Sequence, residues 1–215
     1  MNSRIHIFTG HFGSGKTEVA VNFAVRSANP GTVIVDMDTV NPYFRTAELK
    51  NRLERCGIEV ICSDFAASNV DIPILVPSAA KVFYDESLHC VFDVGGDEDG
   101  AYALGVYRNL FQKYGYEMHF VVNTKRPLTE TAEDIIELME KIEAASGLKI
   151  TDIVNNTNIG KNTDYDTLMS GRYVIDEVCA KKGLGVAFNS GIKSIGRGEK
   201  DFFGLDIYMK KPWEQ

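Results

Sequence analysis

Gly10-His11-Phe12-Gly13-Ser14-Gly15-Lys16-Thr17 is the stretch that decides the fold of this chain. It fits the pattern G-x-x-x-x-G-K-[ST], which is typical of a loop that wraps phosphate groups. Residues 4–9 before it form a short apolar run that predicts a buried strand, and residues 16–28 predict a helix. In this arrangement backbone N–H groups surround an anion at the positive end of the helix. The sequence therefore predicts a phosphate-binding loop between a strand and a helix.

The loop pattern also predicts what individual residues do. Lys16 would reach the β- and γ-phosphates of a nucleotide, and the Thr17 hydroxyl would bind Mg²⁺. A protonated His11 could donate to a phosphate, or its side chain could point away from the ligand, and the sequence leaves both open. The remaining residues expected around the phosphates are Gly10, Phe12, Gly13, Ser14, Gly15 and Glu18.

Length and composition predict a single globular domain over residues 1–215. The net charge of −7 argues against a broad nucleic-acid surface, because such a surface must be basic. The sequence holds no apolar run near the roughly 20 residues that span a membrane, and we expect no secretion signal. Its four cysteines lack C-x-x-C spacing, so we expect reduced core residues in a cytoplasmic protein.

Strand-like and helix-like stretches alternate along the chain. Strands are predicted at 32–36, 58–61, 88–93, 117–123, 150–154 and, last, 185–188. Helices are predicted at 44–56, at 100–114, from a cap at Thr129 to a stop at Gly147, and at 165–182, with an irregular segment at 62–76. Such alternation predicts an α/β fold: a mostly parallel, twisted sheet with helices on both faces, in three α/β/α layers.

Polar residues gather at the predicted carboxyl edge of this sheet, where ligands bind in such folds. They are Asp36, Asp93, Asn123 and Asn155, far apart in sequence. Asp93 follows an apolar run, so we expect it to hold Mg²⁺ together with Thr17 and Asp36. Gly95-Gly96 follow Asp93, and we expect them to let the backbone approach a γ-phosphate. Asp36 and Asp38 form a D-x-D pair, and either could orient or deprotonate a water that attacks the γ-phosphate.

The order of these motifs resembles the MinD/ParA/CobQ/CobB superfamily of SIMIBI-class P-loop NTPases. The resemblance rests on the loop, on Val35-Asp36-Met37-Asp38-Thr39-Val40-Asn41-Pro42 and on Phe92-Asp93-Val94-Gly95-Gly96. It implies binding of ATP or ADP with Mg²⁺ and slow hydrolysis, often coupled to dimerisation. It also implies that Asp38 positions the attacking water, that Asp36 is the strand-end acid of the site, and that Asp93 is the Walker B acid. Asn156 would contact adenine, with Asn155 as the alternative register.

One departure from the resemblance concerns assembly. Members that form an ATP sandwich dimer carry a Lys directly after the first loop glycine, where this chain has His11. A nucleotide-dependent homodimer therefore stays open.

Three functions remain as alternatives. The first is an ATPase switch read by a protein partner, and the second is an ATP-dependent ligase or kinase acting on a small acid. The third is a nucleotide-binding scaffold without relevant turnover. For the second function, a pocket could be lined by Tyr43, Arg45, Lys125 and Arg126. GTP is less expected than ATP, because residues 122–125 lack the guanine-reading Asn-Lys-x-Asp.

Overall fold

The computed structural model describes residues 3–38, 49–62 and 77–209. Within these ranges, eight parallel strands form one sheet in the order β3-β2-β4-β1-β5-β6-β7-β8. Every pair of neighbouring strands is parallel, which confirms the predicted α/β architecture. The strands are β1 (Ile5–Thr9), β2 (Thr32–Met37), β3 (Glu59–Cys62), β4 (His89–Val94), β5 (Glu117–Val122), β6 (Asp152–Asn155), β7 (Gly185–Ile192) and β8 (Phe202–Leu205).

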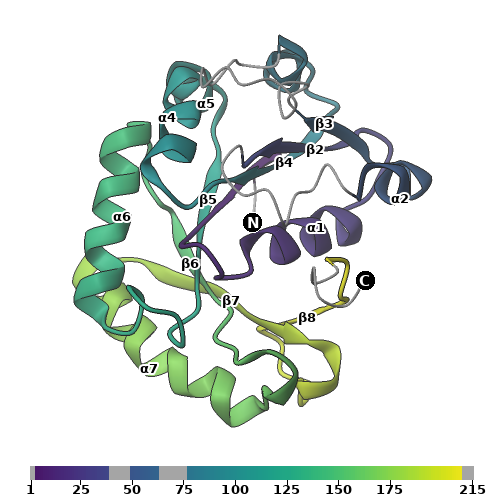
Figure 1. Ribbon diagram of the computed structural model, residues 1–215. Coiled ribbons are helices and arrows are strands. Elements are labelled where there is room, and N and C mark those ends of the chain that lie inside the picture. Colours follow the sequence, from purple (N-terminus) through teal and green to yellow (C-terminus); the bar gives the residue numbers. More distant parts are fainter. Residues whose placement is uncertain (1–2, 39–48, 63–76, 210–215) are drawn as a thin grey trace, which may run out of the picture.

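Helices cover both faces of the sheet (Figure 1). One face packs against α1 (Lys16–Arg26) and α2 (Lys50–Arg55), with a core that includes Phe8, Phe23 and Leu53. The other face has a larger core, which includes Phe92, Phe111 and Phe120. The helices on that second face are α3 (Lys81–Tyr84), α4 (Glu98–Val106), α5 (Arg108–Tyr114), α6 (Ala132–Ser146) and α7 (Tyr165–Lys182). Short 3₁₀ turns occupy Pro77–Ala80, Gly160–Asn162 and Lys193–Ile195.

The strand order places the phosphate loop at a switch point of the sheet. β1 lies between β4 and β5, so the chain continues to one side of β1 through β2 and to the other side through β5. In open parallel sheets, ligands bind where the strand order reverses, at the carboxyl ends of the strands. The loop after β1 lies at that position.

Two helix predictions need correction. The predicted 100–114 helix is divided at Tyr107, whose backbone (φ −94°, ψ 4°) leaves the helical conformation while its ring stacks on Phe83. The cap of α6 is Thr131, not Thr129. The Thr131 side chain accepts from the Asp134 N–H, and the Asp134 carboxylate accepts from the Thr131 N–H, forming a capping box. Gly147 ends α6 as predicted.

The sheet extends further than predicted. β7 continues to Ile192, and β8 adds an eighth strand beyond it. β8 has four residues, one of them glycine, which is too short for a clear strand pattern. The predictions for residues 44–48 and 63–76 lie outside the described residues.

The cysteines only partly follow the prediction of a core position. Cys90 and Cys179 are buried, whereas Cys62 is half-buried and Cys56 is exposed. None of the described helices combines the length and apolar character needed to cross a membrane.

Candidate phosphate-binding site

The loop after β1 has the backbone that a phosphate-binding loop requires. Gly15 precedes α1 with φ 85°, in the left-handed region, and as the N-cap residue it has no side chain that could cap the first N–H groups of the helix. The Ser14 N–H donates to the His11 carbonyl at 3.0 Å, which closes the loop into a tight turn. The helix therefore presents its uncapped N–H groups toward the space that the loop encloses.

Two glycines allow this loop to pack closely against its neighbours. A Cβ on Gly15 would collide with the Asn156 side-chain nitrogen, and a Cβ on Gly96 would collide with the Gly10 carbonyl oxygen. We expected Gly95-Gly96 to approach a γ-phosphate. The structure places Gly96 directly against the backbone of the phosphate loop.

Lys16 and Asp38 form a buried ion pair at the end of the loop. Lys16 Nζ lies 2.6 Å from Asp38 Oδ2, and both side chains are almost fully buried. Burial alone would lower the pKa of Lys16, but Asp93 and Asp38 together raise it above its ordinary value. The ammonium group is therefore charged and held beside the loop, where a phosphate would compete with Asp38 for it.

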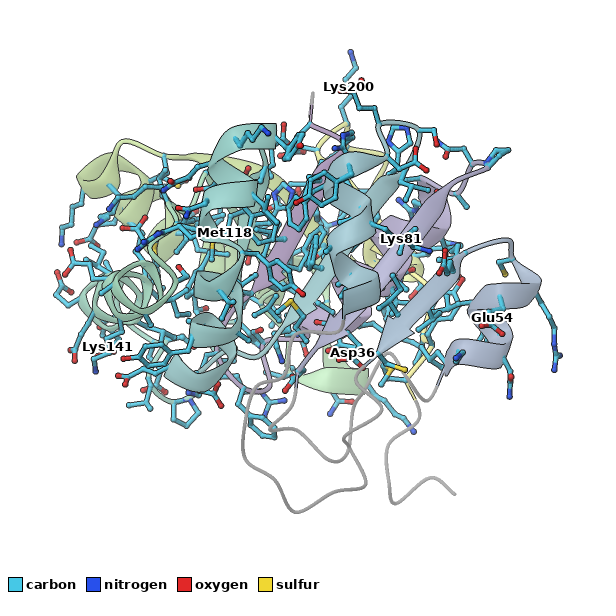
Figure 2. The ribbon with its side chains drawn as sticks, turned by 90° about the horizontal axis from the view of Figure 1, so that it is seen from above. Asp36, Glu54, Lys81, Met118, Lys141 and Lys200 are labelled. Atoms are coloured by element: carbon cyan, nitrogen blue, oxygen red, sulfur yellow. The ribbon has the colours of Figure 1, made fainter. Side chains whose placement is uncertain are left out.

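Asp36 and Asp93 lie side by side on neighbouring strands, opposite each other in the register of β2 and β4. Asp36 is the last residue but one of β2 and is labelled in Figure 2. Asp93 is fully buried, and the Thr17 side chain is near enough to its carboxyl group to lower the pKa of that group slightly. Burial raises the pKa of Asp93 to about 7, opposed by Lys16 and reinforced by Asp36 and Asp38.

This donor set suits Mg²⁺. The three aspartates outnumber the one lysine, so the cluster carries excess negative charge that favours an added cation. Carboxylate and hydroxyl oxygens are the hard ligands that Mg²⁺ prefers. Thr17, Asp36 and Asp93, the residues expected from the sequence to bind metal, are thus brought together at one place.

The two asparagines expected at the base of a nucleotide are engaged within the protein. The Asn156 amide donates to the Ser14 carbonyl at 2.7 Å and accepts from the Ser190 hydroxyl at 3.0 Å, so it supports the loop from below. Asn155 is fully buried and donates to the Leu168 and Asn189 oxygens. Sequence reasoning missed Asn189 and Ser190, because β7 joins this network only through the order of the strands.

Asn123 is likewise used to shape a loop. Its side-chain oxygen accepts from the N–H groups of Lys125 and Asn158, and its nitrogen donates to the Asn158 carbonyl. The Thr129 hydroxyl, predicted to cap a helix, donates to the Asn123 carbonyl at 2.8 Å. Residues 123–129 therefore form a braced loop next to the phosphate loop.

Arg126 connects these two loops. Its Nε donates to the Gly13 carbonyl at 3.2 Å, so a basic side chain lies against the phosphate loop. We expected Arg126 in a second pocket together with Tyr43 and Arg45, but those two residues lie outside the described residues. Arg126 and Lys125 are both exposed.

Glu18 and the aromatic or imidazole residues of the loop lie at its margin. The Glu18 carboxylate accepts from the Tyr208 and Met209 N–H groups, so its side chain faces the C-terminal segment. Phe12 is 61% exposed. Among the described residues, none forms a hydrogen bond with the buried Nδ1 of His11.

The fold resembles those of solved structures from the signal recognition particle system. One is the cell division protein FtsY of Thermotoga maritima (TM-score 0.60, 17% identity, 95% of this chain and 64% of that chain). Another is the signal recognition particle 54 kDa protein of Aeropyrum pernix K1 in complex with GDP (TM-score 0.54, 19% identity, 88% and 41%). FtsY of Mycoplasma mycoides gives a TM-score of 0.57 at 14% identity (93% and 63%).

These likenesses define the class of the fold. The chain has the α/β/α fold of a P-loop NTPase, and the similar structures come from the SIMIBI class. It spans less than two thirds of the length of each of these proteins. The sequence matches no protein-family profile and no curated protein.

Proposed function

We propose that this chain binds ATP with Mg²⁺ and hydrolyses it slowly as a switch of the MinD/ParA/CobQ type. The observation that carries the proposal is the buried Lys16–Asp38 pair beside Thr17 and Asp93, at the end of a complete phosphate loop. Mg²⁺, when bound, would neutralise the phosphate oxygens, with Thr17, Asp36 and Asp93 available to hold it.

The ion pair supports a simple sequence of events. An arriving nucleotide offers phosphate oxygens to Lys16, which exchanges Asp38 for the phosphates. Asp38 is then released to orient or deprotonate the attacking water. Because Gly96 packs on the backbone of Gly10, a change at the phosphates can reach the segment after β4. That segment, together with the loop, is the part that a protein partner or a second copy of the chain would read.

ATP is the proposed nucleotide, although one similar solved structure contains GDP. Residues 123–126 read Asn-Thr-Lys-Arg, which differs from the Asn-Lys-x-Asp that recognises guanine. In addition, the Asn123 side chain is occupied by hydrogen bonds to Lys125 and Asn158.

The test is calorimetric titration of the purified chain with ATP, ADP and GTP, in the presence and absence of Mg²⁺. We expect Mg²⁺-dependent ATP binding that GTP displaces only weakly, and we expect Lys16→Ala to lose it by at least about 100-fold. Lys200→Ala is the matched control, at an exposed lysine labelled at the top of Figure 2, away from Asp36 in the lower half. Thermal unfolding verifies that Lys16→Ala is folded. Equal ATP binding by wild type and a folded Lys16→Ala would refute the proposal.

A second candidate function is an ATP-dependent ligase or kinase that acts on a small acid. The contact of Arg126 with Gly13 favours it, because a guanidinium beside the phosphate loop suits a carboxylate or phosphate substrate. Here small acids should stimulate ADP release, and Arg126→Ala, but not the exposed Arg55→Ala, should abolish the stimulation. A screen of small acids without any stimulation would count against it.

A further inference from the structure

A second group of ionisable side chains lies at the amino ends of the strands, at the edge opposite the phosphate loop. His6 is on β1, Glu117 and His119 are on β5, and Asp152 begins β6. The register of the parallel pairs brings them together, because His6 is opposite Glu117 and His119 is opposite Asp152. Both histidines are buried, whereas Glu117 and Asp152 retain about a fifth of their side-chain exposure.

The potential ligand atoms of this group converge. His6 Nδ1 lies 3.1 Å from His119 Nε2 and 3.4 Å from Glu117 Oε2. One ligand atom from each of the three residues lies within 4.8 Å of the others. Around a tetrahedral Zn²⁺ with bonds of about 2.0–2.1 Å, neighbouring ligand atoms are about 3.3 Å apart. The two shortest separations therefore match the edges of such a tetrahedron.

Asp152 orients one of the histidines. Its Oδ1 lies 2.5 Å from His119 Nδ1, and an ionised carboxylate can only accept, so Nδ1 carries the proton. The lone pair of His119 is then on Nε2, the nitrogen that faces His6. Metal-binding histidines commonly donate their other N–H to a carboxylate in this way, which fixes the tautomer and orients the ring.

The members of this group contact one another and the segments around them. His6 Nδ1 lies within hydrogen-bond distance of His119 Nε2 and close to Glu117 Oε2, while the Ser3 N–H donates to the other Glu117 oxygen, Oε1, at 3.4 Å. The ring of Phe23 packs against His6, and the ring of Phe8 packs against His119. A cation between the three side chains would be partly shielded from water by these rings and would lie next to one carboxylate.

We propose that His6, Glu117 and His119 bind one divalent transition-metal ion of the Zn²⁺ class, with Asp152 positioning His119 and water in the fourth place. Imidazole ligands distinguish this site from the all-oxygen cluster at the phosphate loop, because imidazole suits Zn²⁺ and oxygen donors suit Mg²⁺. The ion would join the amino ends of β1 and β5. Its binding does not depend on nucleotide, so this proposal and the proposed ATPase function can fail separately.

The experiment titrates the metal-free full-length chain with Co²⁺ and then displaces Co²⁺ with Zn²⁺. Every protein carries Cys56→Ser and Cys62→Ser to remove the two more accessible thiols, and excess Mg²⁺ occupies the oxygen cluster. We expect one equivalent of Co²⁺ with the intense visible bands of tetrahedral coordination. Glu117→Gln should weaken binding at least about tenfold, and Asp152→Asn about 10–100-fold.

Control variants make the outcome decisive. His89→Ala removes an exposed histidine at the amino end of β4 and should leave binding unchanged. Zn²⁺ should raise the unfolding temperature of the parent but not of Glu117→Gln, because only a ligand of the folded state stabilises it. Glu117 is partly exposed, so its variant should fold even if His6→Ala does not. Absence of tetrahedral Co²⁺ bands, or equal affinity in the parent and Glu117→Gln, would overturn the proposal.

Discussion

Lys16 and Asp38, two charged residues at the phosphate loop, are each other's partners, and in the proposed ATPase a nucleotide would take the place of Asp38. Lys16 and Asp38 neutralise each other in a buried pair, so neither charge is left without compensation. In the proposed ATPase, Lys16 pairs with the phosphates of the bound nucleotide in place of Asp38. The Asp38 carboxylate then becomes available to orient or deprotonate the attacking water. The same two residues would therefore set both affinity and turnover, but through different steps.

Asp38→Asn should separate those steps. The amide cannot deprotonate water, so we expect kcat for phosphate release to fall about 100-fold or more, as for loss of a general base. The Kd for ATP should change by less than about tenfold, because Lys16 is still present to bind the phosphates. In this variant Lys16 does not have to break an ion pair with a carboxylate first. Phosphate release and calorimetric Kd, measured for this variant and for the exposed control Asp166→Asn, check both values. An unchanged kcat would favour the scaffold without relevant turnover.

Gly15→Ala should disrupt the loop, and Gly183→Ala provides a matched control. Both glycines flank a helix with positive φ, 85° and 68° respectively, so alanine is strained at each by about 1–2 kcal/mol. Only at Gly15 would the added Cβ collide with a neighbour, the Asn156 amide, because nothing lies within 4 Å at Gly183. Urea unfolding and ATP titration should show a larger loss of stability for Gly15→Ala and loss of binding in that variant alone. Similar behaviour of the two variants would contradict the packing argument.

Single helices and loops have separable roles at the scale of the element. α6 begins with an exposed capping box at Thr131, while Thr129, two residues earlier, is buried and ties the 123–129 loop together. One threonine thus caps a helix. The other supports the loop that carries Arg126 to Gly13.

Thr131→Ala and Thr129→Val should distinguish these roles. Removing the cap should cost about 1 kcal/mol of unfolding free energy and leave ATP binding unchanged. Thr129→Val keeps the shape of the side chain but removes the hydroxyl that donates to Asn123, so nucleotide affinity should fall in this variant. Urea denaturation and ATP titration of both variants measure the two effects. Weaker ATP binding in Thr131→Ala would contradict the division of roles.

The whole molecule is held together partly by contacts between distant segments. Glu18, at the start of α1, accepts from the N–H groups of Tyr208 and Met209, about 190 residues later. Burial raises the pKa of Glu18 from 4.5 to about 7, against the opposing effect of these two donors. Between about pH 4.5 and pH 7, the Glu18 carboxyl is therefore protonated in the folded chain but ionised in the unfolded chain.

Stability should fall with rising pH because of Glu18. Between its ordinary pKa and the folded value, the folded state binds more protons, so its contribution is full below about pH 4.5 and is lost as pH rises through about 7. The loss is at most about 3.4 kcal/mol, since a pKa difference of one corresponds to about 1.36 kcal/mol. Glu18→Gln cannot titrate, so its unfolding free energy relative to wild type should increase between pH 5 and pH 8. Urea denaturation at both values measures this.

The control for the Glu18 experiment is Glu54→Gln on α2, an exposed glutamate labelled in Figure 2. Its stability relative to wild type should change little over the same pH range. If Glu18→Gln behaved like Glu54→Gln, the buried carboxyl would not be the source of the pH dependence.

Local patterns were sufficient for the fold class and for the central part of the site. The loop motif, the alternation of strands and helices, and acids at strand ends each depend on a few consecutive residues. They predicted the parallel sheet and brought Lys16, Thr17, Asp36 and Asp93 to one edge of it, because parallel strands share their carboxyl ends. The sequence misplaced the cap of α6, since Thr129 and Thr131 are both plausible caps and only burial distinguishes them.

The sequence by itself determined that this chain is a parallel α/β protein with a phosphate loop and acids beside it. Only the tertiary structure decided that Lys16 is paired with Asp38, that Asn156 supports the loop, and that Arg126 lies against Gly13. It alone placed His6 beside His119, which is 113 residues away in the chain. The physical reason is that such contacts depend on the order and register of strands, which are set by the packing of the whole sheet and not by neighbours in sequence.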